Sequence, residues 1–196
     1  MNYPPPPDLA DREPLIFEVP AGQVWYRSHR VAYDAIYFGK GSQYRWDAPR
    51  GEYGVLYLAA DPYGAFMESI GRGALKSRLV FRADLENRGL SLVQSIRPLR
   101  LIDLVNSGGL TRLGAESSLT SGSGYKNSRR WSKALKKHPA TADGIYYRSR
   151  HDPSRFACAL YQECESVLKA EASERWSGLP TLLGEILDHY AFGTDL

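Results

Sequence analysis

The sequence lacks the long apolar segments that mark membrane proteins and secreted precursors. No apolar run approaches the roughly 20 residues that a helix needs to cross a bilayer. The N-terminal segment, residues 1–11, is polar and rich in proline, without the apolar stretch of a secretory signal. We therefore expect a cytoplasmic protein.

Cysteine is scarce, and its placement does not suggest a metal site. Cys158 and Cys164 form no CxxC pair, and four zinc ligands cannot be assembled from this spacing. One disulfide is conceivable, but two reduced and partly buried thiols fit a cytoplasmic chain better. We expect no bound metal.

The familiar catalytic and nucleotide-binding motifs are also missing. The chain has no GxGxxG, no P-loop, no HExxH and no GxSxG, and none of its four histidines sits in a recognisable nucleophile motif. If the protein is an enzyme, its chemistry must come from Arg, Glu, Tyr and Ser side chains.

The composition that remains is that of one globular domain. The 196 residues are 43% hydrophobic and 24% charged, which is enough for a real core. We expect residues 1–20 to form a flexible, proline-rich tail and residues 21–196 to form a single catalytic domain. The net charge of +3 permits an anionic ligand without requiring nucleic acid.

Local patterns predict strands and helices in irregular order. Strands are expected at residues 23–26, 54–59, 79–85, 99–104, 144–147 and 156–161. Helices are expected from Asp61 to about Ile70, stopping at Gly71 or Gly73, and at residues 128–138 and 181–190. Residues 119–124 are expected to form a mobile loop. Without regular βαβ alternation, the order favours an α+β fold of mostly antiparallel sheets with flanking helices.

Glu68 is the first candidate for chemistry. It lies in the middle of a predicted helix, and its neighbours on that helix face are Gly64, Ala65 and Gly71. A carboxylate among small residues can be approached closely by a ligand. The alternative, which spacing alone favours, is an exposed ion pair between Glu68 and Arg72.

Two arginines are candidates for phosphate binding. Arg45 stands between Tyr44 and Trp46 after a glycine-rich turn. A guanidinium flanked by rings can hold a phosphate with two hydrogen bonds while a ring stacks on a base. A surface arginine lying on Trp46 is an equally good interpretation. Arg27, at the end of a predicted strand, has the same ambiguity.

Tyr57 and Ser149 complete the set of candidates. Tyr57 alternates with apolar residues in a predicted strand and, taken alone, is an ordinary strand tyrosine. Ser149 follows another strand and has no adjacent base, which makes it a poor nucleophile. It could orient a carboxylate or bind a ribose hydroxyl, or it could simply stabilise a turn.

In their order and spacing, these residues resemble the RES-domain family, which is named for an Arg, a Glu and a Ser. The matching positions are Arg45 in Tyr44-Arg45-Trp46, Tyr57, Glu68 and Ser149, with Arg27 matching an early arginine. The resemblance extends from Val24 to Tyr161. One departure is Tyr44, where the family often has glycine. Members are mostly toxins of toxin–antitoxin pairs, with a fold like that of ADP-ribosyltransferases.

The resemblance implies that the substrate is NAD and that no further cofactor is needed. It implies cleavage of the nicotinamide–ribose bond by phosphorolysis or hydrolysis, which would deplete cellular NAD. Glu68 would stabilise the oxocarbenium ion that develops on the ribose, and Arg27 and Arg45 would hold the pyrophosphate. Tyr57 would pack against nicotinamide or its ribose, and Ser149 would position Glu68 or a ribose hydroxyl. An Xre-type antitoxin is the expected partner.

Two other functions are compatible with the sequence. One is transfer of ADP-ribose to a protein, which would use the same site. The other is nucleic-acid binding by a basic segment that contains Trp131. The cations of this segment are Lys126, Arg129, Arg130, Lys133, Lys136 and Lys137. We favour a solvated helix face, or a surface met by an antitoxin, for that segment.

Overall fold

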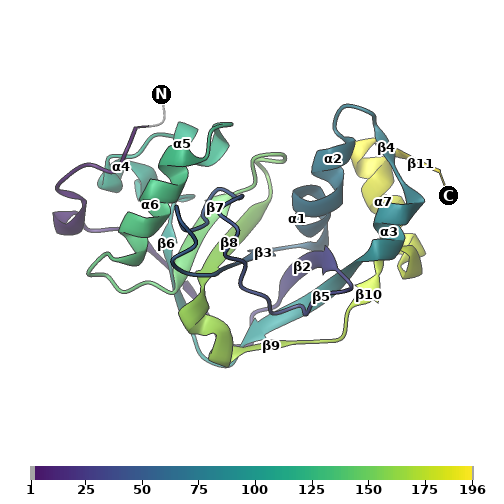
Figure 1. The fold of residues 1–196 in the computed structure, drawn as a ribbon, viewed down its shortest axis with the longest axis horizontal. Coiled ribbons are helices and arrows are strands. Elements are labelled where there is room, and N and C mark those ends of the chain that lie inside the picture. Colours follow the sequence, from purple (N-terminus) through teal and green to yellow (C-terminus); the bar gives the residue numbers. More distant parts are fainter. Residues whose placement is uncertain (1–2, 196) are drawn as a thin grey trace.

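A computed structural model describes residues 3–195 and shows one domain built on a curled, nine-stranded sheet (Figure 1). Its strands are β1 (Ile16–Val19), β2 (Trp25–Arg30), β3 (Val55–Ala59), β5 (Arg88–Ser95), β6 (Leu99–Asp103), β7 (Gly144–Arg148), β8 (Phe156–Tyr161), β9 (Leu168–Ala170) and β10 (Glu174–Arg175). A separate parallel pair joins β4 (Leu79–Val80) to β11 (Gly193–Thr194).

The strands of the large sheet run in the order β1-β6-β7-β8-β3-β2-β5-β10, and β9 also pairs with β5. Every pairing is antiparallel except that of β6 with β7. The predicted α+β fold with mostly antiparallel strands is therefore confirmed. In this order β8 and β3 lie at the centre of the sheet with β2 next to β3, and most of the strands that pair are not consecutive in the sequence.

Two groups of helices flank the sheet. The helices are α1 (Pro62–Phe66), α2 (Arg72–Ala74), α3 (Arg82–Asn87), α4 (Gly109–Leu113), α5 (Ser118–Ser121), α6 (Lys126–Lys136) and α7 (Pro180–Tyr190). Figure 1 shows α4, α5 and α6 gathered beside β6 and β7, and the other helices at the opposite end of the sheet. Within residues 3–195, no helix is both long and apolar enough to cross a membrane.

Shorter helical turns join these elements. They are η1 (Leu9–Asp11), the π-helical turn η2 (Met67–Gly71), η3 (Gln162–Val167) and η4 (Trp176–Gly178). Because η2 directly follows α1 and leads into α2, the three form one continuous helical segment. This segment packs against β2 and β3, which places it beside the centre of the sheet.

Most of the predicted elements are present with small shifts at their ends. The strands expected at 99–104 and 156–161 correspond to β6 and β8, and the helix expected at 181–190 corresponds to α7. Both cysteines are free, as expected, but they are fully rather than partly buried. The local patterns therefore identified most of the elements that surround the candidate site.

The strand expected at residues 79–85 is wrong beyond Val80. Only Leu79 and Val80 pair with another strand, after which the chain turns into α3. The alternation of apolar residues is misleading because Leu85 is buried while Phe81 remains 49% exposed. A two-residue partner, β11, cannot support a longer strand.

The expectation of a flexible tail is also wrong for the part of residues 1–20 that the structure describes. β1 pairs with β6 over four residues, and Leu9 is buried in the core. The indole Nε1 of Trp131 donates to the Tyr3 carbonyl at 2.9 Å, and the His138 ring lies 3.1 Å from the Leu9 carbonyl. These contacts attach the N-terminal segment to α6 and the loop that follows it.

Candidate active site

A cavity of about 690 Å³ lies between the helical segment α1–η2–α2 and the loop that connects β2 to β3. Arg27 of β2, Tyr57 of β3, Arg45 of the loop and Glu68 of η2 all line it. Its volume is within the usual range for small-molecule sites. The structure therefore brings four of the five candidate residues, from four separate segments, to one place.

The lining of this cavity is strongly cationic. Two carboxylates, Asp47 and Glu68, face seven arginine and lysine side chains. These are Arg27, Arg30, Lys40, Arg45, Arg72, Arg88 and Arg150. A partly enclosed site with this imbalance attracts anions, and its potential is stronger than that of an open surface.

Glu68 reaches the cavity from the π-helical turn. The helix begins at Asp61, whose side chain accepts from the Gly64 N–H at 2.9 Å, and Pro62 occupies the first helical position. A π turn adds a residue to the helical repeat and is often found at functional sites. Here it leaves Glu68, Ser69 and Arg72 all lining the cavity.

Ser149, which does not itself line the cavity, holds the Glu68 carboxylate in place. The Ser149 hydroxyl donates to Glu68 Oε1 at 2.5 Å. The Oγ of Ser149 in turn accepts from the backbone N–H groups of His151 and Asp152, both at 3.3 Å. Ser149 is only 2% exposed, so water does not compete for these bonds. The two accepted bonds direct the hydroxyl proton toward Glu68. Ser149 thus both stabilises the turn and orients the carboxylate.

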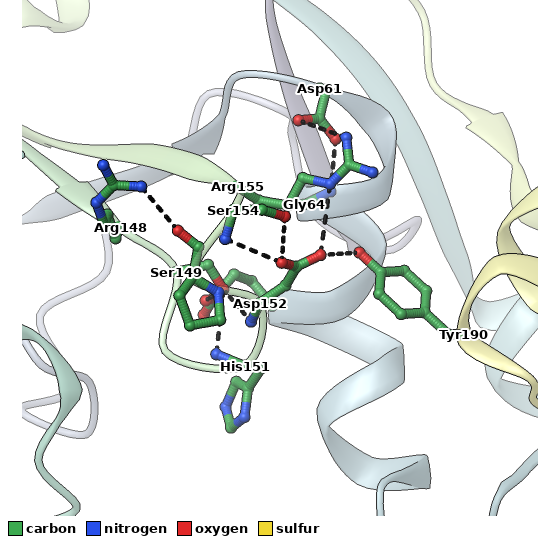
Figure 2. Close-up of polar contacts among 11 residues, drawn as sticks. Asp61, Gly64, Arg148, Ser149, His151, Asp152, Ser154, Arg155 and Tyr190 are labelled. Atoms are coloured by element: carbon green, nitrogen blue, oxygen red, sulfur yellow. Dashed lines mark hydrogen bonds and ion pairs between the residues drawn. The ribbon is translucent and has the colours of Figure 1, made fainter.

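The turn that carries Ser149, between β7 and β8, is fixed by a polar network around Asp152 (Figure 2). Asp152 accepts from the Ser154 hydroxyl at 2.5 Å and from the Tyr190 hydroxyl of α7 at 2.7 Å. Arg155 lies 3.4 Å from Asp152 and 3.4 Å from Asp61, the residue that caps α1. The turn is therefore tied to α7 and to the start of the helix that carries Glu68.

The small residues near Glu68 serve packing rather than ligand access. A Cβ on Gly64 would lie 3.3 Å from the Ala59 Cβ, and one on Gly71 would collide with the Met67 sulfur. Both glycines are buried, and of the three small residues only Ala65 lines the cavity. The expectation that these small residues let a ligand approach Glu68 closely is therefore wrong for Gly64 and Gly71, which do not line the cavity.

The alternative interpretation of Glu68 as half of a surface ion pair is not supported. Among the residues that the structure describes, no ion pair joins Glu68 to Arg72. Arg72 instead lies over the ring of Tyr44, with its Cζ 5.2 Å from the ring centroid. Tyr44, the departure from the family pattern, thus reaches across from the loop to α2.

Arg45 is buried rather than exposed on Trp46. It is 6% exposed, and its two terminal nitrogens donate to the carbonyls of Leu119 and Gly122, both at 2.8 Å. Residues 119–124, expected to be a mobile loop, include most of α5 and are held by these bonds. Burial lowers the pKa of Arg45, but a guanidinium still remains charged near neutral pH. Each terminal nitrogen carries a second N–H for a ligand.

The loop around Arg45 depends on Asp47, which the sequence analysis missed. Asp47 is 3% exposed and accepts from the N–H groups of Gln43 and Tyr44, both at 2.7 Å. It also accepts from the Tyr57 hydroxyl at 2.8 Å, which in turn accepts from the Trp46 N–H at 2.9 Å. The available clue was a lone carboxylate two residues after Arg45. Tyr57 therefore offers its ring, rather than its hydroxyl, to a ligand.

Arg27 also has protein partners. Its guanidinium donates to the carbonyl of Ala35 and, at 3.2 Å, to that of Tyr37. Burial lowers its pKa to about 10, so it remains charged at neutral pH. Arg27 thus braces the loop after β2 while it lines the cavity.

Arg150 and His151 are two further cavity residues that the sequence analysis missed. They directly follow Ser149, and this adjacency was the clue that could have found them. Burial lowers the pKa of His151, the Glu68 charge opposes this, and the Arg150 charge adds to it. The net lowering favours the neutral form of the imidazole.

The basic segment on α6 is largely occupied by contacts within the protein. Trp131, the ring that could have stacked on a base, is 2% exposed and buried in the core. Four of the six cations have partners: Lys133 with Glu52, Lys136 with Glu163, Arg129 with the Tyr44 carbonyl, and Arg130 with Asn127. This favours a solvated helix face over a nucleic-acid interface.

Comparisons with known proteins agree with this arrangement. The RES domain family matches residues 24–178, a span that includes every candidate residue from Arg27 to Ser149. The crystal structure of the M. tuberculosis MbcT–MbcA toxin–antitoxin complex contains a chain of the same fold. The TM-score is 0.64 at 15% identity, over 91% of this chain and 98% of that one. A search of curated proteins finds no match. The chain belongs to the RES-domain family.

Proposed function

We propose that this protein binds NAD in the cationic cavity and breaks its nicotinamide–ribose bond. The observation that carries the proposal is the Glu68 carboxylate, fixed by Ser149 at one wall of a site lined by arginines. A dinucleotide is an anion that needs a fixed carboxylate only at the ribose whose bond breaks. The cavity offers several guanidinium groups for the pyrophosphate and one carboxylate, Glu68, that Ser149 fixes for this ribose.

The proposed chemistry needs little beyond electrostatics. Nicotinamide in NAD is cationic, so it leaves as a neutral molecule with the electron pair of the broken bond. Positive charge then develops at C1′ of the ribose, where the fixed carboxylate of Glu68 stabilises it. Water or inorganic phosphate adds to C1′, and any proton lost passes to solvent. Arg27 and Arg45 hold the pyrophosphate, and the Tyr57 ring packs beside the nicotinamide.

We propose further that the protein is a cytoplasmic toxin that a partner protein restrains. The similar solved chain is part of a toxin–antitoxin complex. Three tyrosines that line the cavity, Tyr33, Tyr37 and Tyr44, are between 42% and 55% exposed. Exposed rings around a cationic site provide a surface that an acidic or aromatic segment of an antitoxin, such as one of the Xre type, can cover.

The sharpest test is Glu68→Gln. The amide keeps an oxygen for the Ser149 hydroxyl, so the fold and NAD binding should persist, while the negative charge is lost. We expect kcat for nicotinamide release to fall about 10²–10³-fold, the usual effect of removing one well-placed electrostatic group. In cells, expression of the parent chain alone should slow growth as NAD falls, and Glu68→Gln should relieve this.

A matched control is Glu86→Gln on α3, where the carboxylate pairs with Arg82 outside the cavity. Arg72→Ala is unsuitable as a control because Arg72 lines the cavity. Equal nicotinamide release by Glu68→Gln and the parent protein, at equal melting temperature, would show that the proposed mechanism is wrong.

A further inference from the structure

Three arginines at one end of the cavity have no role in the mechanism above. Arg30 of β2 and Arg88 of β5 are direct partners across the two strands. Side chains alternate between the faces of a strand, so both lie on the face that carries Ser28. That face packs on the helical segment, because the Ser28 hydroxyl accepts from the Ser69 hydroxyl at 2.5 Å. Arg72 comes from α2, at the end of this same segment, and all three arginines line the cavity.

This grouping of like charges is unfavourable for the protein alone. Two cations directly opposite each other on neighbouring strands destabilise a sheet. Burial lowers the pKa of Arg88, Asp84 partly opposes this, and the Arg30 and Arg72 charges lower it further. The carboxylate of Asp84 lies 3.9 Å from Arg88, at the limit of an ion pair. The other two arginines, Arg30 and Arg72, have no carboxylate within ion-pair distance among the residues that the structure describes.

The three residues are also separate from the arginines assigned to the pyrophosphate. Arg27 and Arg45 donate to backbone carbonyls of the loop after β2 and of α5 with its C-terminal cap. Arg30 and Arg88, by contrast, belong to the side of the sheet that packs on the helical segment. A ligand that satisfied only the first pair would leave the second group of charges unmatched.

We propose that Arg30, Arg72 and Arg88 form a second anion subsite, which binds a phosphate dianion. Guanidinium groups suit this ligand because each offers paired N–H donors that match two phosphate oxygens. The inference rests on the proposed function in one respect: a dinucleotide occupies the rest of the cavity. The dianion is then either a phosphomonoester on that dinucleotide, as on the adenosine ribose of NADP, or free inorganic phosphate.

Binding of two product-like ligands tests the first source. ADP-ribose and its 2′-phosphate carry no nicotinamide bond, so calorimetry at fixed salt measures their affinity without turnover. We expect the 2′-phosphate to bind at least about tenfold more tightly, and Arg88→Gln to remove most of this advantage. Arg30→Gln is a second variant, at a more exposed position, in case Arg88→Gln unfolds. The control is Arg82→Gln, an exposed arginine of α3 that pairs with Glu86.

Titration with inorganic phosphate alone tests the second source. If ADP-ribose and its 2′-phosphate bind equally, but phosphate binds and is lost in the Arg30→Gln and Arg88→Gln variants, the subsite takes free phosphate. If neither variant changes the binding of any of these ligands, the subsite does not exist. The phosphate titration does not depend on NAD turnover. If ADP-ribose does not bind, the proposed function is contradicted. The titration with phosphate would still show whether the subsite exists.

Discussion

Replacing Ser149 by alanine tests whether the orientation of Glu68 matters for catalysis. The change removes a 2.5 Å hydrogen bond to the carboxylate and the acceptor of two backbone N–H groups, at a site too buried for water to substitute. A hydrogen bond to a charged group contributes about 1.5–3 kcal/mol. If most of this energy is expressed in the transition state, kcat should fall roughly 10–150-fold.

The measurement is steady-state nicotinamide release over a range of NAD concentrations, together with the melting temperature. Ser149 does not line the cavity, so KM should change much less than kcat. Ser149→Thr keeps the hydroxyl and should recover part of the rate. The matched control is Ser154→Ala in the same turn, whose hydroxyl bonds to Asp152 instead of Glu68. An unchanged kcat in Ser149→Ala, with a normal kcat in the control, would refute the positioning role.

Three further predictions follow from the contacts of the site. In Arg45→Lys, the single ammonium group cannot bond to two carbonyls and a phosphate at once, so KM for NAD should rise about tenfold or more. Kinetics equal to those of the parent would leave Arg27 as the phosphate ligand. Tyr57→Phe leaves Asp47 and the Trp46 N–H each short of a partner, and calorimetry should show a stability loss of about 1–3 kcal/mol. Burial lowers the pKa of His29 in the folded state, so the folded protein favours the neutral imidazole. The contribution of this residue to stability is therefore fully present above about pH 6.5 and is lost as the pH falls through the lower pKa of the folded state. The melting temperature of His29→Gln should therefore fall less between pH 7 and pH 5 than that of the parent, and an equal fall would exclude His29 as a cause.

The sequence was most informative where the local pattern of a segment agrees with the contacts that the segment makes in the fold. β8 is a continuous apolar run that pairs with a strand on each side, and α7 is an amphipathic helix that begins at Pro180, so both positions could be read directly. The set of candidate residues was also predictable because their order along the chain is distinctive. The contact of Ser149 with Glu68 was foreseen only as one of several possible roles.

Other features depend on contacts between distant segments and left no local pattern. The sequence of the turn η2 carries no pattern that distinguishes a π-helical turn from an α-helical one. The buried state of Arg45 depends on carbonyls more than 70 residues away. Residues 79–85 alternate like a strand, but whether a strand forms depends on the length of the partner, β11, near the other end of the chain.

The strand order also determines when the site can exist during synthesis of the chain. β8 lies between β3 and β7, so the sheet that joins Tyr57 and the Ser149 turn cannot close until residue 161 has left the ribosome. Glu68 and Arg45 are translated far earlier but have none of their distant partners at that stage. A nascent chain that stops before residue 161 therefore lacks the strand that joins the two halves of the candidate site, and the site cannot form until β8 has been added.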